Sequence, residues 1–193
     1  FQVFITAMVV YIGTTAMTSR VFAGNFAALS VILGVGLGSG NQILVAHLVG
    51  AHDYDKANRR VRQTLTVGII SGFLLSVAVA LLGEHLIKLY TDNPEVIRLG
   101  KICLWCDVAV QPFKAVNFIL TTSLRAAGDS KFPAIVGSGM MWTLGLATSL
   151  ILAFVVGLGL PGLWLGMAAD ELYRSFANIW RWRSGRWETK TVV

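Results

Sequence analysis

The sequence predicts an all-α, polytopic membrane protein in which residues 1–193 form a single bundle of six transmembrane helices. Of its 193 residues, 55% are hydrophobic and only 13% are charged, whereas soluble domains have about 25% charged residues. The mean hydropathy is +0.67, so most of the surface is expected to contact membrane lipid. The apolar residues also fall into runs of the length that a helix needs to cross a bilayer.

The first two apolar runs give the first two expected helices. Residues 1–17 are shorter than the roughly 20 residues of a full span, and the chain starts without Met inside this run. We therefore interpret the chain as a fragment of a longer protein. Polar residues at 19–20 interrupt the pattern, and residues 21–50 form the second helix. It is rich in glycine, and Gly36 with Gly40 makes a GxxxG pair that favours close helix packing.

Charged connections flank the third expected helix. Residues 51–62 (AHDYDKANRRVR) are expected to be a solvated loop, and the uncharged residues 64–83 follow as the helix. A connection of mixed charge at 88–98 comes next. Within it, Asp92 is positioned to cap a helix that opens at Pro94.

The fourth expected helix, residues 102–124, carries a row of polar side chains. Their spacing of three or four residues places them on one face of a helix. They are Asp107, Gln111, Lys114, Asn117, Thr121 and Arg125. An aspartate and a lysine within a span need a protein interior or a wet cavity around them. Pro112 lies in the same helix and is expected to kink it.

The fifth and sixth helices are expected at 134–156 and 163–180, after a short basic loop at 125–133. Asp170 and Arg174 are four residues apart in the sixth helix and are expected to pair. The chain then ends in a basic, aromatic tail. Its tryptophans are expected to lie in an interfacial belt. They are Trp180, Trp182 and Trp187.

Basic residues gather on one side of the expected membrane. When successive loops alternate across the bilayer, most of the sixteen basic residues fall in segments on the same side, which predicts a cytoplasmic carboxy terminus. These residues are Lys56, Arg59, Arg60, Arg62, Arg125, Lys131, Arg174, Arg181, Arg183, Arg186 and Lys190. The expected location is a plasma membrane, the bacterial inner membrane in particular. The net charge of +6 is thus a topology signal and predicts no nucleic-acid partner.

Motifs for cofactors and catalysis are missing from the sequence. The glycines at 34–40 lack the Lys-Ser/Thr pair of a phosphate loop. Cys103 and Cys106 form a C-x-x-C pair without a second pair or a nearby histidine. The histidines show no metal-ligand spacing, and no nucleophile is accompanied by a base. We therefore expect no enzyme, no cofactor and no metal site, and no transport driven by ATP.

Four segments resemble those of the multidrug and toxic compound extrusion (MATE) transporters, in that family's order and spacing. They are LVAHLVGAHDYDKANRR (44–60), LIKLYTDNPEVIRLG (86–100), LRAAGDSKFP (124–133) and GLPGLWLGMAADELYRSFANIWRWRSGRW (159–187). The resemblance implies a twelve-helix transporter, of which this chain is the carboxy-terminal six-helix lobe and the amino-terminal lobe is the partner. It also implies export of cationic or amphipathic, drug-like small molecules in exchange for H+ or Na+.

The chain departs from the family pattern at positions that bear on ion coupling. His47 stands where the family usually has Gln, and Ala126 and Ala127 stand where it often has Gly. Sodium-coupled members carry an acidic residue on the fourth helix of this lobe. Lys114 falls near that place and Asp107 lies two turns further out, which argues against sodium coordination by this lobe.

The polar face of the fourth helix is the candidate transport cavity or ion-coupling site. Asp107 would take up a proton or a cation, with the charge of Lys114 near it, although seven residues span about 10 Å along a helix. Gln111, Asn117 and Thr121 would offer hydrogen bonds to substrate or water. In the alternative interpretation, Asp107 is solvated at the outer surface and Lys114 pairs with the other lobe.

Two weaker candidates lie elsewhere, and two other functions stay open. Asn41 either faces the site or forms a helix–helix hydrogen bond, and Trp142 either forms an aromatic wall for flat drugs or packs against lipid. A flippase for lipid-linked saccharides, from the same superfamily, is favoured slightly by Lys114. A membrane-embedded enzyme or structural subunit is the third possibility, but an enzyme would need a cluster of reactive side chains that the sequence lacks.

Overall fold

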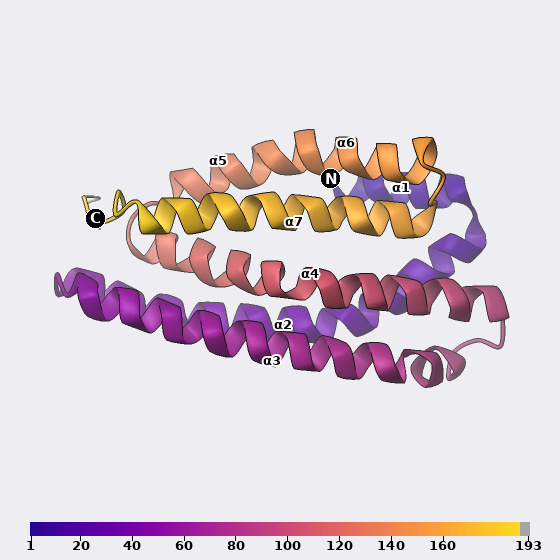
Figure 1. Cartoon of the computed structure of the whole chain (residues 1–193), viewed down its shortest axis with the longest axis horizontal. Helices are drawn as coiled ribbons and strands as arrows, with labels where there is room; N and C mark the ends of the chain where they lie inside the picture. The colour runs from indigo at the N-terminus through magenta and orange to yellow at the C-terminus, as the bar shows by residue number, and fades with distance from the viewer. Residues whose placement is uncertain (190–193) are drawn as a thin grey trace.

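The computed structural model describes residues 1–189, so Lys190, one of the expected inward basic residues, lies outside the described residues. In residues 1–189 the chain runs back and forth through six successive helical segments of one elongated bundle (Figure 1). These segments are α1 (Gln2–Ile12), α2 (Thr14–Gly50), α3 (Tyr54–Lys88), α4 (Pro94–Ala126), the continuous run of α5 (Lys131–Met140), η1 (Met141–Gly145), α6 (Leu146–Leu150) and η2 (Ile151–Val155), and α7 (Leu160–Arg183). The predicted all-α membrane fold is thereby confirmed.

Four of these segments are long and apolar enough to cross a membrane: α2, α3, α4 and the run Lys131–Val155. The shorter α1 has only 11 residues, and α7 carries charged residues in its carboxy-terminal part, from Asp170 to Arg183. Helix α4 is the centre of the bundle, because α2, α3 and α7 all pack along it. Its apolar positions Leu104, Ile119 and Leu124 are almost completely buried.

The break between the first two helices falls at Gly13, so the boundary predicted at 19–20 is wrong. Gly13 has a φ of +136°, which a residue with a side chain rarely adopts. Ser19 continues the helix because its hydroxyl is satisfied inside the bundle, where it donates to the carbonyls of Thr15 (2.8 Å) and Val96 (3.2 Å). The polar residue Ser19 therefore indicates a contact between α2 and α4 and not the end of a helix.

Both charged connections are shorter than expected, because α3 already begins at Tyr54 and α4 at Pro94. These helices have 35 and 33 residues, many more than the roughly 20 that cross the hydrocarbon. Their charged ends therefore extend into water as helix. Helix α4 begins at Pro94, as predicted. The prediction that Asp92 caps this helix is wrong, because the side chain of Asn93 does so and accepts a hydrogen bond from the Glu95 amide at 3.0 Å.

The other end of the bundle uses an aspartate for the same purpose. The side chain of Asp53 caps α3 and accepts a hydrogen bond from the Lys56 amide at 3.2 Å. The Lys56 ammonium group also donates to this carboxylate, at 2.7 Å. This side-chain hydrogen bond, followed by the backbone one, holds the pKa of Asp53 below its ordinary value.

Close helix packing in α2 uses other glycines than the predicted pair. A methyl group added at Gly36 or Gly40 would meet nothing within 4 Å, whereas one at Gly34 or Gly38 would lie 3.3 Å from Phe118 of α4. Residues two apart point to nearly opposite sides of a helix. The composition therefore identified the right helix and the wrong face.

The tryptophan belt expected in the tail is wrong for two of its three members. Trp182 and Trp187 are buried, and their rings stack with centroids 4.3 Å apart. The indole N–H of Trp187 donates to the Trp182 carbonyl at 2.9 Å, which satisfies its polar atom inside the bundle. Trp180 is exposed as a belt residue would be.

Helix α7 is joined to the preceding helical run at both ends. Near its start, Gly162 and Gly166 let the α7 backbone touch the backbone of residues 149–153. Near its end, the Arg181 guanidinium donates to the carboxylate of Asp129, in the loop before α5, at 2.6 Å. Both Arg181 and Asp129 are largely buried, so this ion pair is shielded from water.

We predict that Gly162→Ala destabilises the bundle, because the new methyl group would lie 2.6 Å from the Leu152 carbonyl carbon. Such overpacking costs about 2 kcal/mol, measurable as a lower midpoint of thermal unfolding in detergent. The control is Gly139→Ala, where nothing lies within 4 Å of the added group. It should change stability by less than about 1 kcal/mol, and equal effects of the two variants would contradict the close approach.

Candidate functional site

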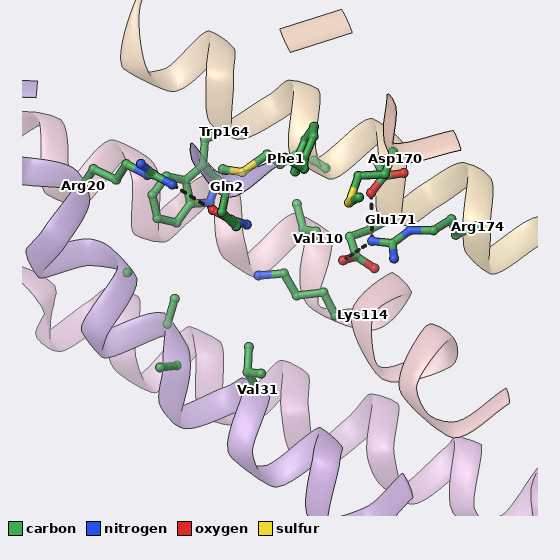
Figure 2. Close-up of a pocket in the computed structure, with 16 residues that line it drawn as sticks. Phe1, Gln2, Arg20, Val31, Val110, Lys114, Trp164, Asp170, Glu171 and Arg174 are labelled. Carbon is green, nitrogen blue, oxygen red and sulfur yellow. Dashed lines mark hydrogen bonds and ion pairs between the residues drawn. The ribbon is translucent and has the colours of Figure 1, made fainter. Parts of the chain in front are cut away.

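A cavity of about 370 Å³ lies between α1, α2, α4, η1 and α7 (Figure 2). Most of its wall is apolar and includes Val31, Val110 and Trp164. Five charged side chains nevertheless reach it. They are Arg20, Lys114, Asp170, Glu171 and Arg174. Because charges within apolar helices are costly unless they are paired or wet, this cavity is the candidate functional site.

Lys114 lies in the cavity wall and forms an ion pair with Asp107, which is buried behind it. The side chain of Asp107 is only 3% exposed, so the alternative that placed this residue in solvent is wrong. The pair spans two helical turns because side chains on an α-helix tilt toward its amino terminus. The long, flexible stem of Lys114 can therefore run back along α4 to the carboxylate.

The polar face of α4 does not point as a whole into the cavity. Gln111 is buried against Gly72 of α3, and its Oε1 atom has no hydrogen-bond partner among the described residues. Asn117 and Thr121 turn toward α7 instead, where both accept a hydrogen bond from the Asn178 amide at 3.2 Å. Of the five principal candidates, Lys114 alone lines the cavity, and Asp107 is linked to it through the ion pair.

A second charged group in the wall comes from α7. Arg174 pairs with Asp170 at 2.8 Å, as predicted, and also with Glu171 at 2.7 Å. Glu171 in turn accepts a hydrogen bond from Asn117 of α4 at 2.6 Å. In Figure 2 the ion pairs of Arg174 lie at one side of the cavity and Lys114 extends into the space beside them.

Arg20 lies on the far side of the same cavity, on α2. Its guanidinium donates to the side chains of Gln2 at 2.9 Å and Thr6 at 2.7 Å, both on α1. These partners are neutral, and within the described part of the chain no carboxylate lies within ion-pair distance of Arg20. Among the described residues Arg20 is therefore held by neutral hydrogen-bond partners and makes no direct ion pair.

Sequence reasoning missed four of the five charged side chains of the cavity as parts of the site: Arg20, Asp170, Glu171 and Arg174. From the sequence, Arg20 is interpreted as part of an interruption between helices, and Asp170 and Arg174 are assigned to an ion pair within the sixth helix. The available signal was the presence of charged residues inside otherwise apolar helical runs, which usually marks a functional or paired group. The spacing that revealed the polar face of α4 does not connect residues on different helices.

The two weaker candidates lie outside the cavity lining. Asn41 is buried and donates to Ser123 of α4 while it accepts from Thr64 of α3, both at 2.8 Å. It thus links three helices, which confirms the helix–helix interpretation of this residue. Trp142 is 45% exposed and packs edge-on against Phe4, with ring centroids 5.5 Å apart.

Comparisons with known proteins show which family the sequence resembles. The family model described as MatE matches residues 1–151. The uncharacterised transporter YisQ of Bacillus subtilis is 30% identical over 192 residues, which are 100% of this chain and 42% of YisQ. The probable multidrug resistance protein NorM of Thermotoga maritima is 25% identical over 181 residues, which are 94% of this chain and 39% of NorM.

The fold is also that of a solved transporter. A structure described as the outward-facing conformation of a multidrug resistance MATE family transporter superposes with a TM-score of 0.84, at 19% identity, over 99% of this chain and 43% of its own. This chain spans about two fifths of the length of the relatives it matches. With a family model matching most of its length and a relative 30% identical along all of it, the chain belongs to the MatE family of multi-pass membrane transporters.

Proposed function

We propose that the chain is the carboxy-terminal lobe of a secondary active antiporter that exports cationic or amphipathic small organic compounds in exchange for H+ or Na+. The observation that carries this proposal is the convergence of charged side chains from α2, α4 and α7 on one cavity inside an apolar bundle. Relatives with multidrug resistance or toxin extrusion in their names support the substrate class. An amino-terminal lobe of similar size would face this cavity and complete it.

The Asp107–Lys114 pair offers a physical route to antiport. While Asp107 is ionised, it holds the Lys114 ammonium group at the cavity wall. Protonation of Asp107 would remove that attraction and free a positive charge, which would repel a cationic substrate from the cavity. Proton uptake and cation binding would then exclude each other, as exchange requires. The ammonium group already occupies the carboxylate, so the pair favours H+ over Na+ as the coupling ion.

The orientation we propose places the carboxy terminus in the cytoplasm of a bacterial inner membrane. The loop at 51–53, the loop at 127–130 and the end of α7 lie at one end of the bundle (Figure 1). Most of the basic residues of the described chain also gather at this end, among them Arg59, Arg60 and Arg183. Positive charge flanking transmembrane helices marks the cytoplasmic side.

Arg20 supports a second candidate, a flippase for lipid-linked saccharides. Arg20 forms no direct ion pair with a carboxylate of the described residues, and an anionic phosphate would provide such a partner. The two candidates differ in the charge of the transported molecule. An efflux assay with a cationic dye therefore separates them, since a flippase would leave the dye in the cell.

We predict that Asp107→Asn in the full-length protein reduces gradient-driven ethidium efflux by at least about tenfold. A hydrogen bond to a charged group contributes about 1.5 kcal/mol or more, and the neutral amide cannot take up a proton. Efflux is followed by dye fluorescence in cells with an imposed pH or sodium gradient. The control is Asp92→Asn, which makes the same change on an exposed loop and should leave efflux unchanged. Undiminished efflux in Asp107→Asn would remove the coupling role.

We also predict that Lys114→Met destabilises the lobe more than the double variant Asp107→Asn/Lys114→Met. The single change leaves a buried carboxylate without its cation, which costs about 3 kcal/mol or more, while removing both charges avoids that penalty. Thermal unfolding of the purified protein in detergent measures both. A double variant as unstable as Lys114→Met would mean that the pair contributes little to folding.

A further inference from the structure

A second hollow lies on the opposite side of α4 from the cavity. It is a groove of about 860 Å³ between α3, α4 and α7, and its wall includes Val116 and Leu120 of α4. Val116 follows Lys114 by two residues, which is about 200° around a helix. The groove therefore faces away from the candidate transport site, toward the surroundings of the bundle.

The floor of this groove is apolar. Val116 and Leu120 are buried, and Leu65, Ile69 and Ile179 are half-buried around them. Along α3 the lining extends from Asp55 to Ile69, about 21 Å at the rise of an α-helix. This floor thus runs from one end of the bundle toward its middle, with the length and chemistry that suit part of an acyl chain.

The mouth of the groove is positively charged. Arg59 and Arg62 lie one turn apart on α3, and Arg183 lies across from them at the end of α7. All three are exposed, and in residues 1–189 none makes an ion pair. Asp55 and Glu188 also line the groove, so the charge at the mouth is positive by one unit.

We propose that this groove binds an anionic phospholipid of the inward leaflet, with an acyl chain on the apolar floor and the phosphate among the three arginines. Arginines form charge-assisted hydrogen bonds to phosphate, and basic pockets between helices at the cytoplasmic side are suited to lipid headgroups. The assignment of the leaflet rests on the orientation proposed above. The groove lies on the other side of α4 from the cavity, so lipid binding there can be measured without a transported substrate.

The test is retention of phosphatidylglycerol by the full-length protein, purified in detergent with equal amounts of phosphatidylglycerol and phosphatidylcholine and read by native mass spectrometry. The wild type should retain phosphatidylglycerol preferentially. Arg62→Gln/Arg183→Gln should weaken its binding roughly tenfold to thirtyfold. The matched control, Arg60→Gln/Arg186→Gln, removes the same charge from residues outside the groove and should weaken it by less than about threefold.

A further variant separates a lipid from a free phosphate. Ile69→Trp would fill the floor without changing any charge, so it should also release phosphatidylglycerol, and added inorganic phosphate should not displace the lipid. Three outcomes would overturn the site. They are equal loss of phosphatidylglycerol in the two double arginine variants, equal retention of the two lipids by the wild type, and undiminished phosphatidylglycerol binding by Ile69→Trp. Lipid retention is measured without a substrate or an ion gradient. Failure of the efflux prediction would therefore leave the lipid result unaffected, and failure of the lipid test would leave the efflux prediction unaffected.

Discussion

The structure depends on the rule that a charged group inside an apolar bundle must find its partner within the protein. Lipid offers no hydrogen bonds, and an isolated charge there costs several kcal/mol. Helix α4 provides several of these partners, because it lies between α2, α3 and α7. Its own lysine is held by its own aspartate, and its Asn117 binds the carboxylate of Glu171 on α7. Because α4 is surrounded by other helices, its polar side chains can find partners within the protein.

The spacing of the polar residues on α4 predicts that they share one face of the helix. It does not predict which of them contact α3, which contact α7 and which line the cavity. Gln111 and Asn117 are six residues apart, about 120° around a helix, and so one packs on α3 and the other on α7. Which part of such an arc meets a cavity depends on where the other helices lie. Arg20 enters the site from α2 for the same reason, and no periodicity within α4 could have indicated it.

The helix boundaries show a different limit of sequence reasoning. Hydropathy marks the edge of the hydrocarbon, whereas a helix ends where its backbone groups are capped or its conformation changes. Asp53 and Asn93 cap helices well outside the apolar runs, and Gly13 separates α1 from α2 inside one. The number of helices and their order along the chain were predictable from composition, because both depend only on the apolar runs.

The two attachments of α7 have a consequence for movement. With its start against the backbone of residues 149–153 and its end tied to Asp129, α7 and the helical run before it form a stiff unit. A conformational change would then act most easily along the seam between this unit and α4. That seam is crossed by the hydrogen bonds of Asn117 and Asn178, so α7 could slide along α4 only after these bonds are broken.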